Sequence, residues 1–142
     1  MSRFLVVIVL ALGLAAPAVA EDFTRYALSV ATIQKVQSAS KEIEKKVGKK
    51  YEDNKADENM DAARFAKFVD SVPEAKPILA KHGLSSKEFA HASFAMMEAG
   101  LFVMLTMDPK ADQKEAAKLM ATYPAETRAN IELLRRNPQL LK

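Results

Sequence analysis

His91 and Glu98 are the residues of this chain best suited to acid–base chemistry or to binding a metal ion. They stand seven positions apart, which is two turns of a helix, so their side chains are expected on one face. An imidazole and a carboxylate so placed could flank a cavity or supply two metal ligands. Two turns span about 10.8 Å, however, too far for a shared metal ion unless both side chains lean together. We therefore expect separate structural roles, with His91 in the exposed first turns of a helix and Glu98 hydrogen-bonded or facing a polar seam.

The other histidine and the methionines offer weaker signals of ligand binding. His82 precedes Gly83 at the expected end of a helix, where an imidazole commonly caps the last carbonyl groups. Thioether sulfur can bind copper or serve as an axial haem ligand. The methionines that invite this interpretation are Met96, Met97, Met104, Met107 and Met120. Because they are spaced among leucine and phenylalanine, they are more typical of a pliable core.

None of the motifs that identify enzymes with high specificity is present. The chain has no G-x-S-x-G, no H-E-x-x-H, no phosphate-binding glycine loop, no EF-hand loop and no C-x-x-C-H. The leading hypothesis is a non-enzymatic protein that binds a peptide, an apolar ligand or a partner protein through a groove or face of the fold. A haem or metal carrier using a histidine and a methionine is the first alternative, and an enzyme using His91 and Glu98 is the last. We assign no catalytic residue, cofactor or metal.

The first twenty residues have the pattern of a cleaved secretory signal peptide. Arg3 precedes an apolar run over residues 4–14, and Ala18 and Ala20 form an A-x-A site before Glu21. This run is shorter than a membrane-spanning helix, which needs about 20 apolar residues. We predict cleavage between Ala20 and Glu21, with export to the periplasm or the exterior of a bacterium.

The mature chain, residues 21–142, is expected to form one soluble domain without a stable membrane anchor. It contains no cysteine, which excludes an acylated cysteine, a disulfide and a thiolate metal site. Loss of Arg3 lowers the charge of the full chain from +3 to +2, which is too balanced to indicate nucleic-acid binding. The apolar stripe of the first helix is narrow and suits packing within the fold or against a second copy, so a monomer and a homodimer both remain open.

The apolar spacing predicts an all-α fold, namely a bundle of four main helices and one short helix. The first helix is expected to begin after Ser29, with its inward stripe at Ile33, Val36, Ser40, Ile43 and Val47. The charged segment from Lys49 to Met60 is typical of an exposed connection. Asn59 or Asp61 is the expected N-cap of the next helix. The further helices are expected over residues 62–72, 74–82, 86–107, 111–121 and 126–136.

The long helix over Ser86–Met107 is expected at the centre of the bundle. Gly83 ends the short helix before it, and the residues from Ser85 to Glu88 form a capping box that opens it. Apolar residues occupy nearly every direction around this helix, as in lipid or at the centre of a bundle. Because Glu98 and His91 would be expensive at membrane depth, we predict a buried central helix.

The segment VPEAKPILAKHGLSSKEFAHASFAMMEAG, Val72 to Gly100, resembles a pattern in small exported bacterial proteins of unknown function. In these proteins a proline-marked short helix and a glycine-leucine-serine turn, here Gly83-Leu84-Ser85, lead into a long helix rich in alanine and methionine. The resemblance implies export and a helical fold. It implies no activity, cofactor or site residue, because a fold does not fix a function.

Overall fold

The computed structural model describes residues 23–48 and 60–142, and this part of the chain is all α-helical without a strand. The all-α class is therefore confirmed. The described ranges contain six α-helices, one at each of the six ranges expected from the sequence, so the summary count of four main helices and one short helix was one too low. In chain order the elements are η2 Phe23–Arg25, α2 Val30–Val47, α3 Ala62–Ser71, α4 Ala75–Lys81, α5 Ser86–Thr106, α6 Gln113–Thr122, α7 Ala125–Arg136 and η4 Pro138–Leu141.

The N-termini of the helices follow the capping residues in the sequence. The Ser29 hydroxyl accepts a hydrogen bond from the amide of Thr32 at 3.1 Å and opens α2. Asp61, one of the two predicted caps, opens α3 in the same way. At α5 the capping box is complete: the Ser85 hydroxyl accepts from the Glu88 amide, and the Glu88 carboxylate accepts from the Ser85 amide at 2.8 Å.

Proline and glycine end the two helices that precede α5. Pro73 forces Val72 into an extended conformation, with a ψ angle of 106°, so α3 stops at Ser71. Gly83 has a φ angle of 68°, in the left-handed region that favours glycine. The next amide, that of Leu84, then donates to the carbonyl of Leu79 at 2.9 Å. The chain reverses here and enters α5 as predicted.

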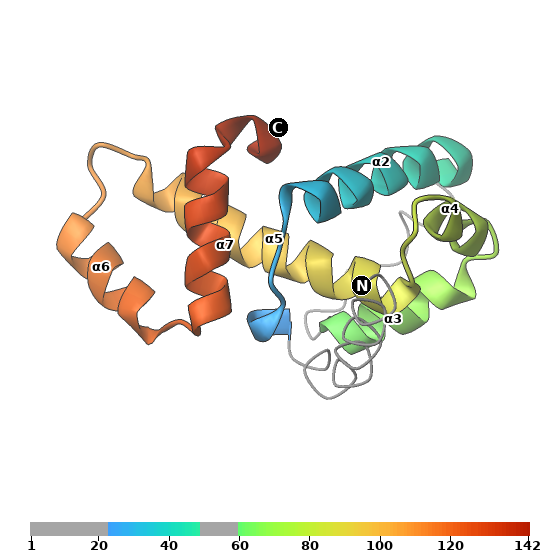
Figure 1. Ribbon diagram of the computed structural model, residues 1–142, viewed down its shortest axis with the longest axis horizontal. Coiled ribbons are helices and arrows are strands. Elements are labelled where there is room, and N and C mark those ends of the chain that lie inside the picture. Colours follow the sequence, from blue (N-terminus) through green and yellow to red (C-terminus); the bar gives the residue numbers. More distant parts are fainter. Residues whose placement is uncertain (1–22, 49–59) are drawn as a thin grey trace, which may run out of the picture.

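Helix α5 carries two hydrophobic cores, one on each half. In Figure 1, α2, α3 and α4 gather around its beginning, while α7 crosses its other half and α6 lies beyond. The first core contains Val36, Ala39, Val69, Val72, Ala75, Ile78, Leu79, Leu84, Phe89 and Ala92. The second core contains Ile33, Ala99, Phe102, Val103, Ile131, Leu134 and Leu140. Met96 packs against both cores, so the two halves are continuous along α5.

One position of the predicted α2 stripe is wrong. Ile33 and Val36 are buried as expected, but Ser40 is exposed and the preceding Ala39 is completely buried instead. Both positions fit a helical period of 3.6 residues, and the apolar methyl group of alanine is the one that faces the core. Ser40 is thereby left at the surface between α2 and α5.

The prediction that α5 is buried all round is wrong for its second half. Four of its apolar residues there are more than half exposed, namely Met97, Leu101, Met104 and Leu105, and so is the C-cap residue Met107. The physical reason is that the neighbouring elements leave open spaces beside α5. Met97, Leu101 and Met104 line one against α2 and the C-terminal turn, and Leu105 lines another against α6, which has no buried residue. By length and composition α5 could cross a membrane, yet half of its most apolar stretch is buried against other helices, as in the core helix of a soluble protein.

The segment before α2 is fastened to α7 by buried side chains. The Asn130 side chain accepts from the amide of Leu28 at 2.8 Å and donates to the carbonyl of Tyr26 at 2.7 Å. The Thr127 hydroxyl donates to the carbonyl of Thr24 at 2.7 Å. Asn130 and Thr127 are 3 % and 2 % exposed, so these bonds replace water at the backbone of residues 24–28.

Candidate functional site

His91 is buried, which corrects the prediction that it lies exposed in the first turns of α5. Only 2 % of its surface is accessible, because residues 23–28 and α3 pack against this part of α5. Its Nδ1 donates to the carbonyl of Lys87 at 2.8 Å, and its ring lies 6.5 Å from that of Tyr26. Its Nε2 is buried and has no hydrogen-bond partner among the residues that the structure describes.

Glu98 lies in different surroundings, so the structure does not bring the predicted acid and base together. Its carboxylate is half buried on the side of α5 that faces Tyr123. Burial, followed by the nearby charge of Glu98, raises the pKa of the Tyr123 phenol above its ordinary value of 10.0. His91 contacts Tyr26 in the first half of α5, and Glu98 influences Tyr123 in the second. The geometry gives no support to a catalytic pair.

His82 joins two helices through its ring and does not cap carbonyl groups with it. Its backbone amide satisfies the end of α4, while its Nε2 donates to Glu42 at 3.0 Å. The Lys81 ammonium donates to both oxygens of the same carboxylate, at 3.1 and 3.0 Å. Glu42 thus ties α2 to the end of α4, which is a structural role.

Glu42→Gln is expected to reduce stability at neutral pH and to have less effect in acid. The hydrogen bonds from His82 and then from Lys81 hold the pKa of Glu42 below its ordinary value of 4.5. A lowered pKa in the folded state adds stability above 4.5, which is lost as the pH falls through the folded value. Urea midpoints of the two proteins, measured from pH 7 to about pH 3, should therefore converge in acid. Glu44→Gln, on the exposed part of the same helix, is the control. If the difference between the urea midpoints of the native and Glu42→Gln proteins stays constant with pH, the ion-pair role of Glu42 is contradicted.

The methionines do not form the pliable core that their spacing predicts. Of the five methionines considered, Met97, Met104 and Met107 are more than 60 % exposed, whereas Met96 and Met120 are half buried. Within residues 23–48 and 60–142, no group of three or more His, Cys, Asp and Glu side chains is placed to hold a metal ion. The exposed sulfur atoms lie on a surface of α5, whereas His91 is buried.

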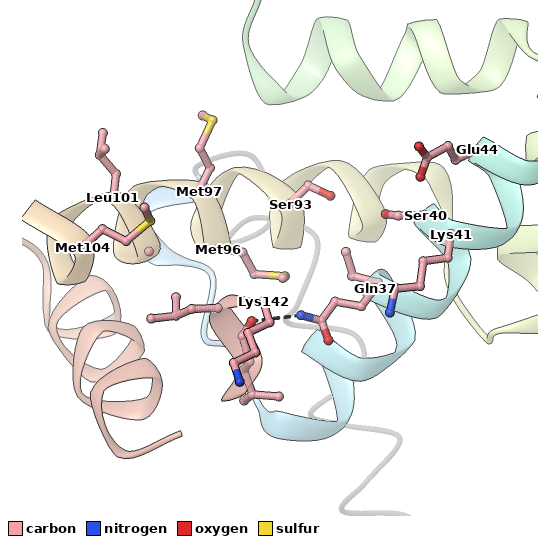
Figure 2. A pocket seen from close by; sticks show the side chains of 14 residues that line it. Gln37, Ser40, Lys41, Glu44, Ser93, Met96, Met97, Leu101, Met104 and Lys142 are labelled. Carbon is pink, nitrogen blue, oxygen red and sulfur yellow. Dashed lines mark hydrogen bonds between the residues drawn. The ribbon is translucent and has the colours of Figure 1, made fainter. Parts of the chain in front are cut away.

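An apolar groove, called here the α5 groove, runs between α5, α2 and the C-terminal turn η4. Figure 2 shows its lining, with Met97, Leu101 and Met104 on α5 and with Gln37, Lys41 and Lys142 on the opposite wall. The groove has a volume of about 580 Å³, within the range of small-molecule sites. The remaining lining residues are Val36, Ser40, Glu44, Ser93, Met96, Gly100, Leu140 and Leu141.

Small side chains and one long-range hydrogen bond shape the floor of the groove. Gly100 lacks a side chain where Leu141 packs, and a Cβ atom there would lie 3.5 Å from the Leu141 side chain. The side-chain amide of Gln37 donates to the carbonyl of Leu140 at 2.9 Å and fixes η4 against α2 (Figure 2). The groove is therefore held open by the native packing of three elements.

A second, smaller cavity meets the α5 groove at Ser40 and Glu44, which line both. It lies between α2 and α3 with a volume of about 240 Å³. We call it the phenylalanine cavity, because Phe65, Phe68 and Phe89 line it, together with Ile43, Val47, Gly48, Val69, Val72 and Ala75. Apart from the two shared residues, its lining is entirely apolar.

The α5 groove is the largest apolar hollow described above, and it contains none of the titratable residues considered as a catalytic pair. From the sequence, Met96, Met97 and Met104 were considered only as haem or copper ligands or as core residues. The groove itself was missed, because exposed methionine and leucine have the same spacing as buried ones. The only sequence signal was the excess of apolar residues on α5 over what one helix can bury in so short a chain. No family model, no curated protein and no solved structure matches this chain.

Proposed function

We propose that this chain is an exported, non-enzymatic binding protein that holds the apolar part of another molecule in the α5 groove. The observation that carries the proposal is the exposed apolar face of α5 beside a concave groove. Leaving such side chains in water is unfavourable, and a ligand that covers them recovers about 25 cal/mol for each Å² of apolar surface removed from water. Exposed methionines also adapt to ligands of different shape.

The separation of the titratable groups supports binding over catalysis. His91 and Glu98 face different neighbours, and the carboxylate of Glu42 is engaged by His82 and Lys81. Export rests on residues 1–20, which lie outside the described part of the chain. The protein for the experiments below is therefore exported from a bacterial host as the full-length chain. If the mass of the purified protein corresponds to a chain that begins at Glu21, cleavage after Ala20 is supported.

The double variant Met97→Glu, Leu101→Glu should lose the binding of an apolar fluorescent dye such as anilinonaphthalene sulfonate. These side chains are 61 % and 56 % exposed, so the fold should tolerate the change, whereas two carboxylates in the groove would repel an apolar or anionic probe. We expect binding weaker by about tenfold or more, equivalent to at least 1.4 kcal/mol. Fluorescence titration gives the affinity, and circular dichroism checks the helix content.

Leu119→Glu is the matched control, because Leu119 is an exposed leucine, at 49 %, on α6 outside the groove. It should bind the dye as the native chain does. If Leu119→Glu weakens binding as much as the double variant, the dye covers the face between α5 and α6. If the native chain binds no dye, the groove does not bind apolar molecules, and the proposal is wrong.

A further inference from the structure

We propose that the α5 groove and the phenylalanine cavity form one site for a long-chain fatty acid, with the end of the tail in the cavity, the rest of the chain in the groove and the carboxylate near Lys41. This inference rests on the proposed function, since it names the ligand of the same groove. It is drawn from the two residues that the spaces share, from the size and lining of the cavity and from the placement of the charges.

The adjacency of the two spaces favours an elongated ligand. The groove and the cavity share Ser40 and Glu44 in their linings, and the proposed ligand lies along α5, passes Ser40 and enters between α2 and α3. Ser40 is small and exposed at this junction, where the expected apolar stripe would have placed it inward. A larger side chain here would close the passage without disturbing either core.

The size and lining of the cavity favour a hydrocarbon chain over a helix of a partner protein. A helix with its side chains is about 10–12 Å across and would stay in the open groove. The cavity of about 240 Å³ is lined by three phenylalanine rings and aliphatic side chains. Among its described lining residues, Ser40 and Glu44 alone have polar side chains that could bond to a peptide backbone. A peptide entering it would leave backbone groups without hydrogen bonds, at a cost that methylene groups do not incur.

The charges along the groove set the direction of the ligand. Figure 2 places Lys41 and Lys142 beside Gln37 on one wall, while Glu44 lies toward the junction with the cavity. Among the described residues, neither lysine forms an ion pair with a carboxylate. Glu44 repels an anion at the junction, so the apolar end is the one that enters the cavity. Lys41 lies on a regular helix and is therefore expected to contribute more than Lys142 to the binding of the ligand's carboxylate.

The inference is tested by titrating the delipidated mature protein with palmitate and with octanoate, using isothermal calorimetry and displacement of the dye. We expect saturable binding of one palmitate per chain and much weaker binding of octanoate, because each buried methylene changes affinity by a factor of about four. Ser40→Phe should weaken palmitate binding by about tenfold or more, the affinity equivalent of 1.4 kcal/mol. Ser38→Phe changes an exposed serine of α2 that does not line the groove, and should bind as the native chain does.

The charge of Lys41 is tested separately. Lys41→Gln removes the charge and leaves a polar side chain one atom shorter, and it should weaken palmitate binding by about fivefold to tenfold, as expected when a charge-assisted contact is lost. Lys45→Gln, on the same helix but outside the groove, should have no effect.

Equal palmitate binding by the Ser40→Phe variant and the native chain would overturn the path through the junction.

The possible outcomes separate this inference from the proposed function. If the dye binds the groove but palmitate neither binds nor displaces it, the fatty-acid inference is overturned and the proposed function stands. If neither dye nor palmitate binds, both are overturned. If the protein binds phosphatidylcholine vesicles but not free palmitate, the exposed face of α5 serves a membrane surface and the fatty-acid inference is likewise overturned.

Discussion

Replacing Asn130 by alanine should lower the free energy of unfolding by about 2–4 kcal/mol. The side chain makes two hydrogen bonds to the backbone of Leu28 and Tyr26, and it is 3 % exposed. Its removal leaves an amide and a carbonyl group buried without partners, and each such group costs about 1–3 kcal/mol. Urea unfolding followed by circular dichroism gives the change in free energy.

Two variants distinguish the lost hydrogen bonds from a general effect of mutating α7. Asn130→Asp keeps an oxygen that can accept from Leu28 but replaces the donor to Tyr26 by a second oxygen, so it should also be destabilised. Arg128→Ala changes an exposed residue of the same helix and should stay within about 0.5 kcal/mol. If Asn130→Ala proved as mild as Arg128→Ala, residues 24–28 would not depend on α7 for their position.

The local features of this fold could be predicted from the sequence because they depend on neighbouring residues. Each of these features acts over a few neighbouring positions. Ser29 and the pair Ser85 and Glu88 cap the first turns of their helices. Pro73 lacks an amide hydrogen, and Gly83 adopts a left-handed turn. The ends of α2, α3, α4 and α5 follow from them. For the same reason, the all-α class could be predicted without any knowledge of how the helices pack.

The groove and the burial of His91 could not be predicted, since they depend on contacts between distant parts of the chain. Leu28 and Asn130 are 102 positions apart, and nothing local in the sequence indicates that they pair. The segment they hold covers His91. In the same way, the exposure of Met97 and Leu101 depends on where α2 and η4 lie, because an apolar helix has the same composition whether its faces are covered or open.

Ile131→Ala should destabilise the protein by about 2–5 kcal/mol and should loosen both cores together. Ile131 is completely buried on α7 against the second half of α5, so its truncation leaves a cavity in the second core. The loss should also reach the first core, because α5 is one continuous helix and Met96 packs against both. Hydrogen exchange measures this directly, through the protection of amide groups in α3 and in α7.

Equal loss of protection in α3 and α7 is the result expected of a single cooperative unit. Leu119→Ala is the control, since this leucine is about half exposed and should change stability by no more than about 0.5 kcal/mol. Loss of protection in α7 alone would mean that the two halves of α5 unfold independently. The groove would then be the boundary between two units, because its walls come from α2 in the first half and from η4 in the second. A cooperative result instead makes α5 a rigid wall, so a ligand loses little binding energy to ordering the backbone that carries Met97, Leu101 and Met104, while these side chains adapt to its shape.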